Sequence, residues 1–172
     1  MAIEPDTKNW TWVLERRCPA CGFDAHTVAF QDLPALLRDN IASWPGVLER
    51  PDVAVRPDDS TWSPLEYAAH VRDVFHVFSG RLNLMLAEHN PEFENWDQDA
   101  SALAGRYGEQ DPLQIRDELV EAGTELADAF ERVPIEAASR TARRSDGSHF
   151  TVETLGRYML HDVVHHRWDV AG

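Results

Sequence analysis

The sequence SPLEYAAHVRDVFHVFSGRLNLM at residues 63–85 combines a helix start with a long apolar stripe. Ser63 is the expected N-cap, Pro64 suits the first helical position, and Glu66 completes an S-x-x-E capping box. Apolar residues then recur at helical spacing, at Tyr67, Val71, Val74, Phe75, Phe78, Leu82 and Met85. These features predict a long helix with one continuous apolar side.

Three further segments have helical spacing. The first covers residues 33–48, where Asp32 is the expected N-cap and Pro45 is expected to kink the last turn. Another begins at Asp111, and the last begins at its cap Thr151 and runs nearly to the end of the sequence. Four helices in one chain of 172 residues predict an all-α fold, a four-helix bundle.

The connections between these helices are unequal. Residues 89–110 form a long connector, and the Asp146-Gly147 turn predicts a short hairpin before the last helix. Residues 1–29 show no helical pattern and are expected to form an irregular lead-in. The bundle itself is therefore assigned to residues 30–172.

The composition limits the partners of the protein. The chain has 16 Lys and Arg against 30 Asp and Glu, a net charge of −14, which argues against nucleic acids and anionic membranes as partners. A membrane-spanning helix needs about 20 mostly apolar residues, and the longest run without Asp, Glu, Lys or Arg covers only residues 40–48. The first ten residues do not resemble a secretory signal, so a cytoplasmic location is predicted.

The sequence HDVVHH at residues 161–166 carries the strongest chemical signal. His161 and His165 are four residues apart, so both rings leave the same side of a helix and can reach one divalent ion. His166 is turned about 100° away from that pair. A third ligand is expected from the helix at 63–85, where His70 lies at the margin of the apolar stripe.

These positions predict a metal site made of His70, His161 and His165, with open positions for water or substrate. The alternative is that the histidines are incidental to a structural or partner-binding bundle. A histidine ligand usually donates its other N–H to a carboxylate or a carbonyl. Asp169, Asp162 and Asp73 are the candidates for that supporting role, against the alternative that they are solvated or capping residues.

The motif Cys18-Pro-Ala-Cys21-Gly at residues 18–22 is half of a zinc ribbon. His26 follows Cys21 at a spacing that suits a ligand, so a second zinc site made of Cys18, Cys21 and His26 would need one more, remote ligand. A redox pair is a weaker alternative, because no thioredoxin-like strand and helix surround the motif. The remaining alternative is a reduced pair that packs with nearby aromatic side chains, namely Trp10, Trp12 and Phe23.

Other enzyme motifs are absent from the sequence. It has no G-x-S-x-G, G-x-G-x-x-G or P-loop pattern. The motif H-E-x-x-H of zinc proteases is also missing, because Asp162 stands where it would place the glutamate. These absences disfavour a serine hydrolase, a dinucleotide-dependent enzyme and a zinc protease.

Two segments together resemble a known family. The sequence WSPLEYAAHV at residues 62–71 and the sequence GRYMLHDVVHHRWDV at residues 156–170 look like the DinB/YfiT-like superfamily of metalloenzymes, over residues 30–172. The resemblance implies a four-helix bundle in up-down-down-up order. It also implies a divalent metal, zinc or nickel, held by the residues that match the family's ligands, His70, His161 and His165.

The same resemblance implies a chemistry. Characterised relatives use a low-molecular-weight thiol, either mycothiol or bacillithiol, as cosubstrate in S-transferases, and mycothiol in maleylpyruvate isomerase. The metal would bind the sulfur of the cosubstrate and stabilise a thiolate that attacks a small electrophile. The expected function is therefore a thiol-dependent S-transferase or isomerase, with a non-catalytic metal- or ligand-binding bundle as the alternative. Relatives commonly form homodimers, so a homodimer is also expected.

Overall fold

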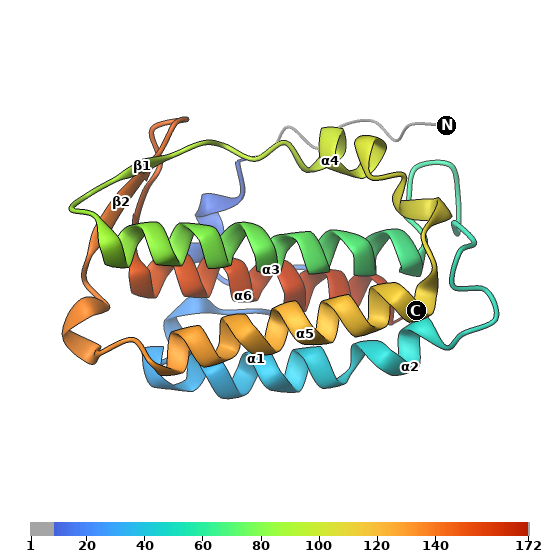
Figure 1. Ribbon diagram of the computed structural model, residues 1–172, viewed down its shortest axis with the longest axis horizontal. Helices are drawn as coiled ribbons and strands as arrows, with labels where there is room; N and C mark the ends of the chain where they lie inside the picture. Colours follow the sequence, from blue (N-terminus) through green and yellow to red (C-terminus); the bar gives the residue numbers. More distant parts are fainter. Residues whose placement is uncertain (1–8, 172) are drawn as a thin grey trace.

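The computed structural model describes residues 9–171, and its long helices lie side by side in a bundle (Figure 1). The bundle consists of α1 (Leu33–Ala42) continued by α2 (Trp44–Leu48), α3 (Pro64–Ala87), α5 (Pro112–Glu131) and α6 (Val152–Asp169). Helix α5 packs against α1 and α3, and α6 packs against the same two helices. The four segments therefore close around one core, which confirms the predicted all-α four-helix bundle.

The helices follow the up-down-down-up order that the family resemblance implies. Helices α1 and α6 run in one direction, and α3 and α5 run in the other (Figure 1). Because α3 and α5 are parallel, the chain between them must return along the whole bundle. This connector contains β1 (Glu92–Phe93), α4 (Gln98–Ala104) and the 3-10 turn η4 (Tyr107–Glu109).

The helix starts follow the local sequence closely. The backbone N–H of Glu66 donates to the Ser63 hydroxyl at 3.2 Å, and the backbone N–H of Ser63 donates to the Glu66 carboxylate at 2.8 Å. The predicted capping box of α3 is thus confirmed. Thr151 caps α6 and Asp111 caps α5 through their side chains, as predicted.

The first helix differs from its prediction in two details. Asp32 stands at the N-cap position but its side chain caps nothing, because the 3-10 turn η3 (Phe30–Asp32) leads directly into α1. The helix is broken rather than only kinked: α1 ends at Ala42 and α2 begins at Trp44. Pro45 has no N–H to donate to the preceding turn, which accounts for the break.

A small sheet closes one end of the bundle. Strands β2 (Thr141–Arg144) and β3 (His149–Thr151) form the predicted antiparallel hairpin, and β1 adds to β2 in parallel. Gly147 has a φ of +91° in the hairpin turn, a conformation that favours glycine. The hairpin ends at Thr151, the N-cap of α6, and therefore sets where that helix begins.

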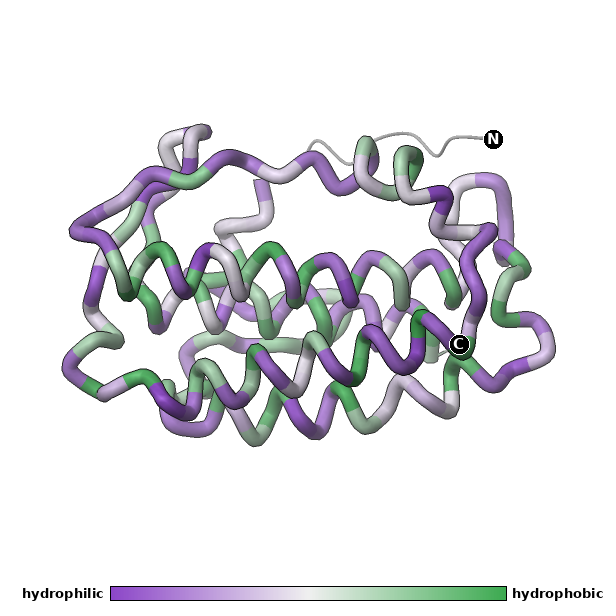
Figure 2. The backbone as a smooth tube through the Cα atoms, in the orientation of Figure 1, coloured by the Kyte–Doolittle hydropathy of each residue, from purple (hydrophilic) through white to green (hydrophobic). Residues whose placement is uncertain are grey.

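The core holds α6 in a fixed register. Hydrophobic residues recur along the inner sides of the long helices (Figure 2). Among them lies the buried amide of Asn40, which donates to the Val163 carbonyl at 3.0 Å and accepts from the Trp44 indole at 3.1 Å. This contact ties α1 to the middle of α6, next to the histidine motif.

The lead-in packs on α6. It contains the 3-10 turns η1 (Trp10–Leu14) and η2 (Ala25–Thr27), and both contact α6. Residues 1–8 of the predicted lead-in at 1–29, and residue 172 of the predicted bundle at 30–172, lie outside the described part. Within the described residues, no helix is both long enough and apolar enough to cross a membrane.

Candidate metal centre

Helix α6 carries two different pairs of metal-ligand side chains. His161 and His165 are four residues apart, and so are Asp162 and His166. A step of one residue turns the side chain by about 100° around an α-helix. The two pairs therefore face different neighbours, although they overlap in the sequence.

The pair Asp162 and His166 meets His70 of α3. The Oδ1 atom of Asp162 lies 3.3 Å from Nε2 of His70 and 3.5 Å from Nε2 of His166. The contact with His70 is a long hydrogen bond, and the distance to His166 exceeds the usual N–H···O range of about 2.7–3.2 Å. Donors that share one zinc ion at about 2.0–2.1 Å in tetrahedral geometry lie about 3.3–3.4 Å apart. The three side chains thus have the spacing of ligands of a single ion.

The start of α3 sets the position of His70. The capping box of Ser63 and Glu66 fixes where the helix begins, and His70 follows in the second turn. Its side chain is completely buried, and its Nδ1 atom has no hydrogen-bond partner among the described residues. This unpaired atom is not the Nε2 atom that faces Asp162, so a role of His70 as a metal ligand depends on Nε2 alone.

Aromatic side chains surround the two histidines. The His70 ring stacks on Trp96 of the connector, with ring centres 5.4 Å apart and planes 7° apart. Trp62 approaches the same ring at 5.4 Å, and Tyr67 covers His166 at 5.1 Å. Such an apolar surround lowers the local dielectric and limits access of water to the site.

The protonation states suit a cation. Burial lowers the pKa of His70, so the ring is neutral at pH 7, the form that binds a metal. Burial works to raise the pKa of Asp162, but the hydrogen bond to His70 and the nearby histidine charges outweigh it and lower this pKa to about 2. The exposed fractions of the Asp162 and His166 side chains are 24% and 18%, so solvent reaches this side of the cluster.

Asp169 contacts the ring nitrogen of His166 that faces away from Asp162. Its Oδ2 atom lies 2.9 Å from Nδ1 of His166, which leaves the Nε2 atom of that ring directed toward Asp162. The other carboxylate oxygen lies 3.9 Å from Nε2 of His165. The shorter contact is thus made to the neighbouring histidine.

The other two candidate supporting carboxylates have different surroundings. Asp162 lies inside the cluster as a ligand-type side chain. Asp73 accepts a hydrogen bond from Arg72 at 2.8 Å and another from the Tyr107 hydroxyl. It therefore links α3 to the connector.

The pair His161 and His165 faces the lead-in. There it meets Cys18 and Cys21, and one ligand atom from each of the four residues lies within 4.8 Å of every other. Burial raises the pKa of Cys21 to about 11, so without a bound cation its thiol stays protonated. The residues that surround this cluster are considered further below.

The histidines expected to share one ion are thus divided between two clusters. His161 and His165 lie with the cysteines, and His70 lies with an aspartate and a third histidine. His26, the expected partner of the cysteines, instead places its Nε2 atom 3.2 Å from the Glu15 carbonyl oxygen. The two clusters have different donor sets and are compared with known metal sites below.

His166 is a ligand-type residue that was not predicted from the sequence. The signal was present, because Asp162 and His166 are four residues apart and Asp169 follows three residues later. A search restricted to histidine pairs passes over this combination. Counting aspartate as a ligand gives two overlapping pairs in the same motif.

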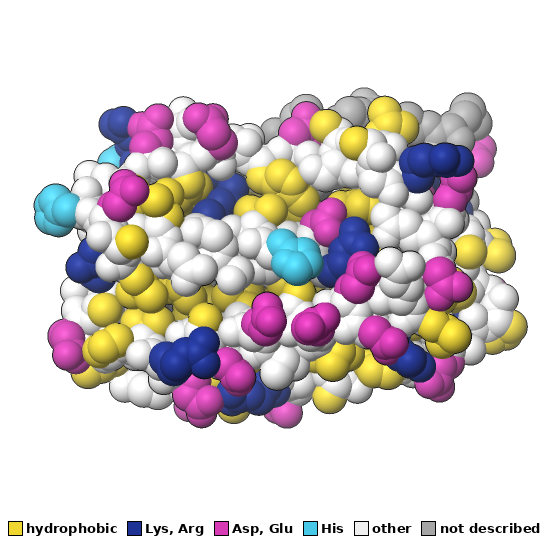
Figure 3. Space-filling view, in the orientation of Figure 1, with side chains coloured by type: hydrophobic (Ala, Val, Ile, Leu, Met, Phe, Trp, Pro, Cys, Tyr) yellow, Lys and Arg dark blue, Asp and Glu magenta, His cyan; other side chains and the backbone are white. Residues whose placement is uncertain are grey.

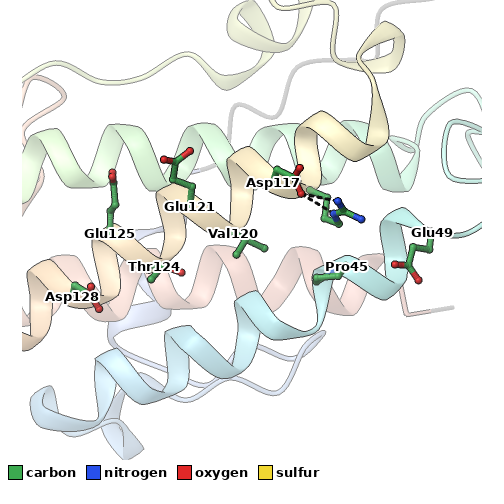
Figure 4. A pocket seen from close by; sticks show the side chains of 9 residues that line it. Pro45, Glu49, Asp117, Val120, Glu121, Thr124, Glu125 and Asp128 are labelled. Carbon is green, nitrogen blue, oxygen red and sulfur yellow. Dashed lines mark hydrogen bonds and ion pairs between the residues drawn. The ribbon is translucent and has the colours of Figure 1, made fainter.

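A described groove lies away from both clusters. It has a volume of about 700 Å³ between α5 and the α1–α2 side of the bundle (Figure 4). Carboxylates line much of it, from Glu49, Asp117, Glu121, Glu125 and Asp128, and acidic side chains also gather along α5 in the space-filling view (Figure 3). None of its lining residues belongs to either cluster, so the groove does not contribute to the candidate centre.

The comparisons with known proteins agree with the fold. The sequence model of the DinB superfamily matches residues 37–170. A solved structure of YfiT from Bacillus subtilis, described as a probable metal-dependent hydrolase with an unusual four-helix bundle topology, aligns with a TM-score of 0.73. It is 19% identical, and the alignment covers 83% of this chain and 86% of that one. No curated protein matches the sequence.

Proposed function

Because the chain belongs to the DinB superfamily, we propose that it is a metal-dependent enzyme whose ion is held by His70, Asp162 and His166. The proposal rests on three ligand atoms from two helices that lie close together. The Oδ1 atom of Asp162 is 3.3 Å from Nε2 of His70 and 3.5 Å from Nε2 of His166. We propose this set in place of the expected three-histidine set, because His70 lies nearest to Asp162 and His166 of α6.

The donor set favours catalysis over a purely structural role. Catalytic zinc sites keep three protein ligands and an open position, whereas structural sites are closed by four. The cluster supplies two imidazoles and one carboxylate, and its α6 side is partly exposed. A divalent ion bound here supplies Lewis acidity, which lowers the pKa of a thiol or a water molecule beside it.

We propose a low-molecular-weight thiol, mycothiol or bacillithiol, as cosubstrate and a small electrophile as substrate. Support comes from the motifs at residues 62–71 and 156–170, which resemble those of thiol-dependent relatives. In an S-transfer reaction the thiol loses its proton, the sulfur forms a bond to an electrophilic carbon, and the leaving group departs with the bonding electrons. In an isomerisation the thiol adds to the substrate and is released again.

The residues of the chain have distinct tasks in this scheme. His70 stays neutral through burial and offers a lone pair, while Asp162 contributes a negative charge that balances a divalent cation. Asp169 holds the ring of His166 in one orientation. The stacked Trp96 shields the buried side of the cluster from water.

Hydrolysis is the second candidate. The description of YfiT as a probable metal-dependent hydrolase favours it, and the same open site would then activate water. The donor set is the same for both reactions, so the nucleophile must be identified by experiment. Zinc and nickel are the proposed metals, and the homodimer and the cytoplasmic location remain predictions from the sequence.

A turnover assay tests the proposal. Protein loaded with zinc or nickel is incubated with a panel of electrophiles, with mycothiol, with bacillithiol, and with neither, and products are identified by mass spectrometry. We expect an S-conjugate or an isomerised product that requires both the metal and one thiol. Products formed equally well without thiol, from ester or amide substrates, would identify a hydrolase.

Variants connect turnover to the site. His70→Ala is expected to abolish turnover and to remove one ion per chain. His76→Ala is the matched control, since His76 is an exposed histidine on the same helix. Metal occupancy and turnover that survive in His70→Ala would refute the site. An intact metal site without turnover on any electrophile or ester would support the non-catalytic alternative.

A further inference from the structure

The Cys-Pro-Ala-Cys-Gly loop of the lead-in has a defined fold of its own. The backbone N–H of Cys18 donates to the Phe23 carbonyl at 2.8 Å, and that of Gly22 donates to the Cys18 carbonyl at 3.0 Å. Gly22 has a φ of +78°, a conformation that favours glycine. Arg17 closes the loop by donating to the Gly22 carbonyl at 2.9 Å. The loop thus fixes both cysteines relative to α6.

The spacing of the donor atoms matches a tetrahedral zinc site. The Sγ atom of Cys18 lies 3.6 Å from Nδ1 of His165. A sulfur at about 2.3 Å and a nitrogen at about 2.0–2.1 Å from the same zinc ion, at the tetrahedral angle, lie about 3.6 Å apart. Cys21 and His161 complete a compact group of four ligand atoms.

One nitrogen of this cluster has no other function in the fold. The Nε2 atom of His161 is buried and has no hydrogen-bond partner among residues 9–171. Buried polar atoms are nearly always paired with protein or with a bound group. The unpaired nitrogen next to two thiols therefore points to a ligand that is a cation.

The surroundings bury two of the four ligands, whereas Cys21 and His165 are partly exposed. Cys18 is 1% exposed and His161 is 3% exposed. The Trp10 ring lies 5.8 Å from the His161 ring and 5.3 Å from the His165 ring, and Phe23 approaches His161 at 5.5 Å. Four protein ligands in an apolar shell are typical of structural zinc and leave no position for a reacting molecule.

We infer that Cys18, Cys21, His161 and His165 form a structural zinc site that fastens the lead-in to α6. On binding, both thiols release their protons and ligate zinc as thiolates, while both imidazoles bind as neutral rings. Between residues 9 and 29 the chain forms only 3-10 turns and loops. The ion adds a further link to the contacts that already hold this segment against α6, such as the hydrogen bond from Arg157 to the Val28 carbonyl at 2.9 Å.

Metal counting tests this inference independently of any activity. Untagged protein, purified under reducing conditions and supplied with zinc, is analysed for metal per chain together with Cys18→Ser/Cys21→Ser. We expect the double variant to hold one zinc ion fewer than the wild type. His26→Ala is the matched control, because His26 lies in the same segment but outside the cluster, and it should keep the full zinc content.

Cobalt distinguishes this site from the proposed catalytic one. Cobalt bound by two thiolates and two imidazoles gives thiolate-to-metal charge-transfer bands, which a site of two histidines and an aspartate cannot give. We expect these bands in the wild type and in Asp162→Ala/His166→Ala, and we expect them to be lost in Cys18→Ser/Cys21→Ser. Bands that survive loss of the cysteines would overturn the inference.

The wild-type protein provides a test that does not depend on folding of the variants. In mild denaturant, where both thiols become accessible, bound zinc should slow their alkylation, and a chelator should abolish that protection. Two thiols that react at the same rate with and without zinc under these conditions would refute the site. A Cys18–Cys21 disulfide that persists under reducing conditions would refute it as well.

Discussion

Replacing Asp169 by asparagine tests how the proposed catalytic site holds its metal. The Asp169 carboxylate lies 2.9 Å from Nδ1 of His166, and this contact leaves Nε2 of the ring directed toward Asp162. Loss of such a supporting partner costs about 10–100-fold in metal affinity, or about 1.4–2.8 kcal/mol. Asparagine keeps the shape and an acceptor oxygen but loses the charge. We therefore expect a decrease near tenfold for Asp169→Asn and nearer a hundredfold for Asp169→Ala.

The affinity is best measured in the Cys18→Ser/Cys21→Ser background, where the proposed structural zinc site is removed. Zinc is titrated in competition with a chromophoric chelator. Asp73→Asn is the matched control, because Asp73 lies near the site but pairs with Arg72 and Tyr107. An unchanged affinity in Asp169→Asn, or an equal decrease in Asp73→Asn, would refute the assigned role of Asp169.

Three further predictions concern stability. Burial and the nearby His165 lower the pKa of His161 from 6.5 to about 4, so between these pH values the unfolded chain takes up a proton that the folded chain excludes. Metal-free protein should therefore lose about 3 kcal/mol of unfolding free energy as the pH falls from 6.5 to about 4. In urea titrations, His161→Gln should make the unfolding free energy less dependent on pH. A Cβ at Gly123 would lie 2.7 Å from Ile41, so Gly123→Ala should lower the unfolding free energy by about 1–3 kcal/mol through overpacking. Gly80 has open space around it, so Gly80→Ala should raise the unfolding free energy by about 0.5–1 kcal/mol in the same assay. Asn40→Ala should cost about 1–3 kcal/mol in chemical denaturation, because it leaves the buried Trp44 indole without its acceptor.

The features that were predictable from the sequence are those set by local chemistry. Ser63 and Glu66 specify the start of α3 through contacts within one turn, and Thr151 does the same for α6. The hairpin follows from the Asp-Gly turn at residues 146–147. In contrast, the break between α1 and α2 and the uncapped Asp32 depend on how neighbouring turns join, which local residue preferences describe less well.

The grouping of the metal ligands depends on distant contacts. The motif at residues 161–166 contains two overlapping pairs at i and i+4, and the sequence gives no direct reason to choose which pair faces α3. That choice follows from the rotation of α6, which the buried Asn40 contact and the helix packing fix. In the proposed zinc site, the remote ligands of the cysteines are His161 and His165, about 140 residues later, which no local spacing rule can indicate.

The central claim is that one helix serves two metal sites with different ligands. Anomalous diffraction from crystals of zinc-loaded protein, recorded on both sides of the zinc absorption edge, tests it directly. The account predicts two peaks per chain, one among His70, Asp162 and His166 and one among the two cysteines, His161 and His165. A single peak coordinated jointly by His70, His161 and His165 would contradict it.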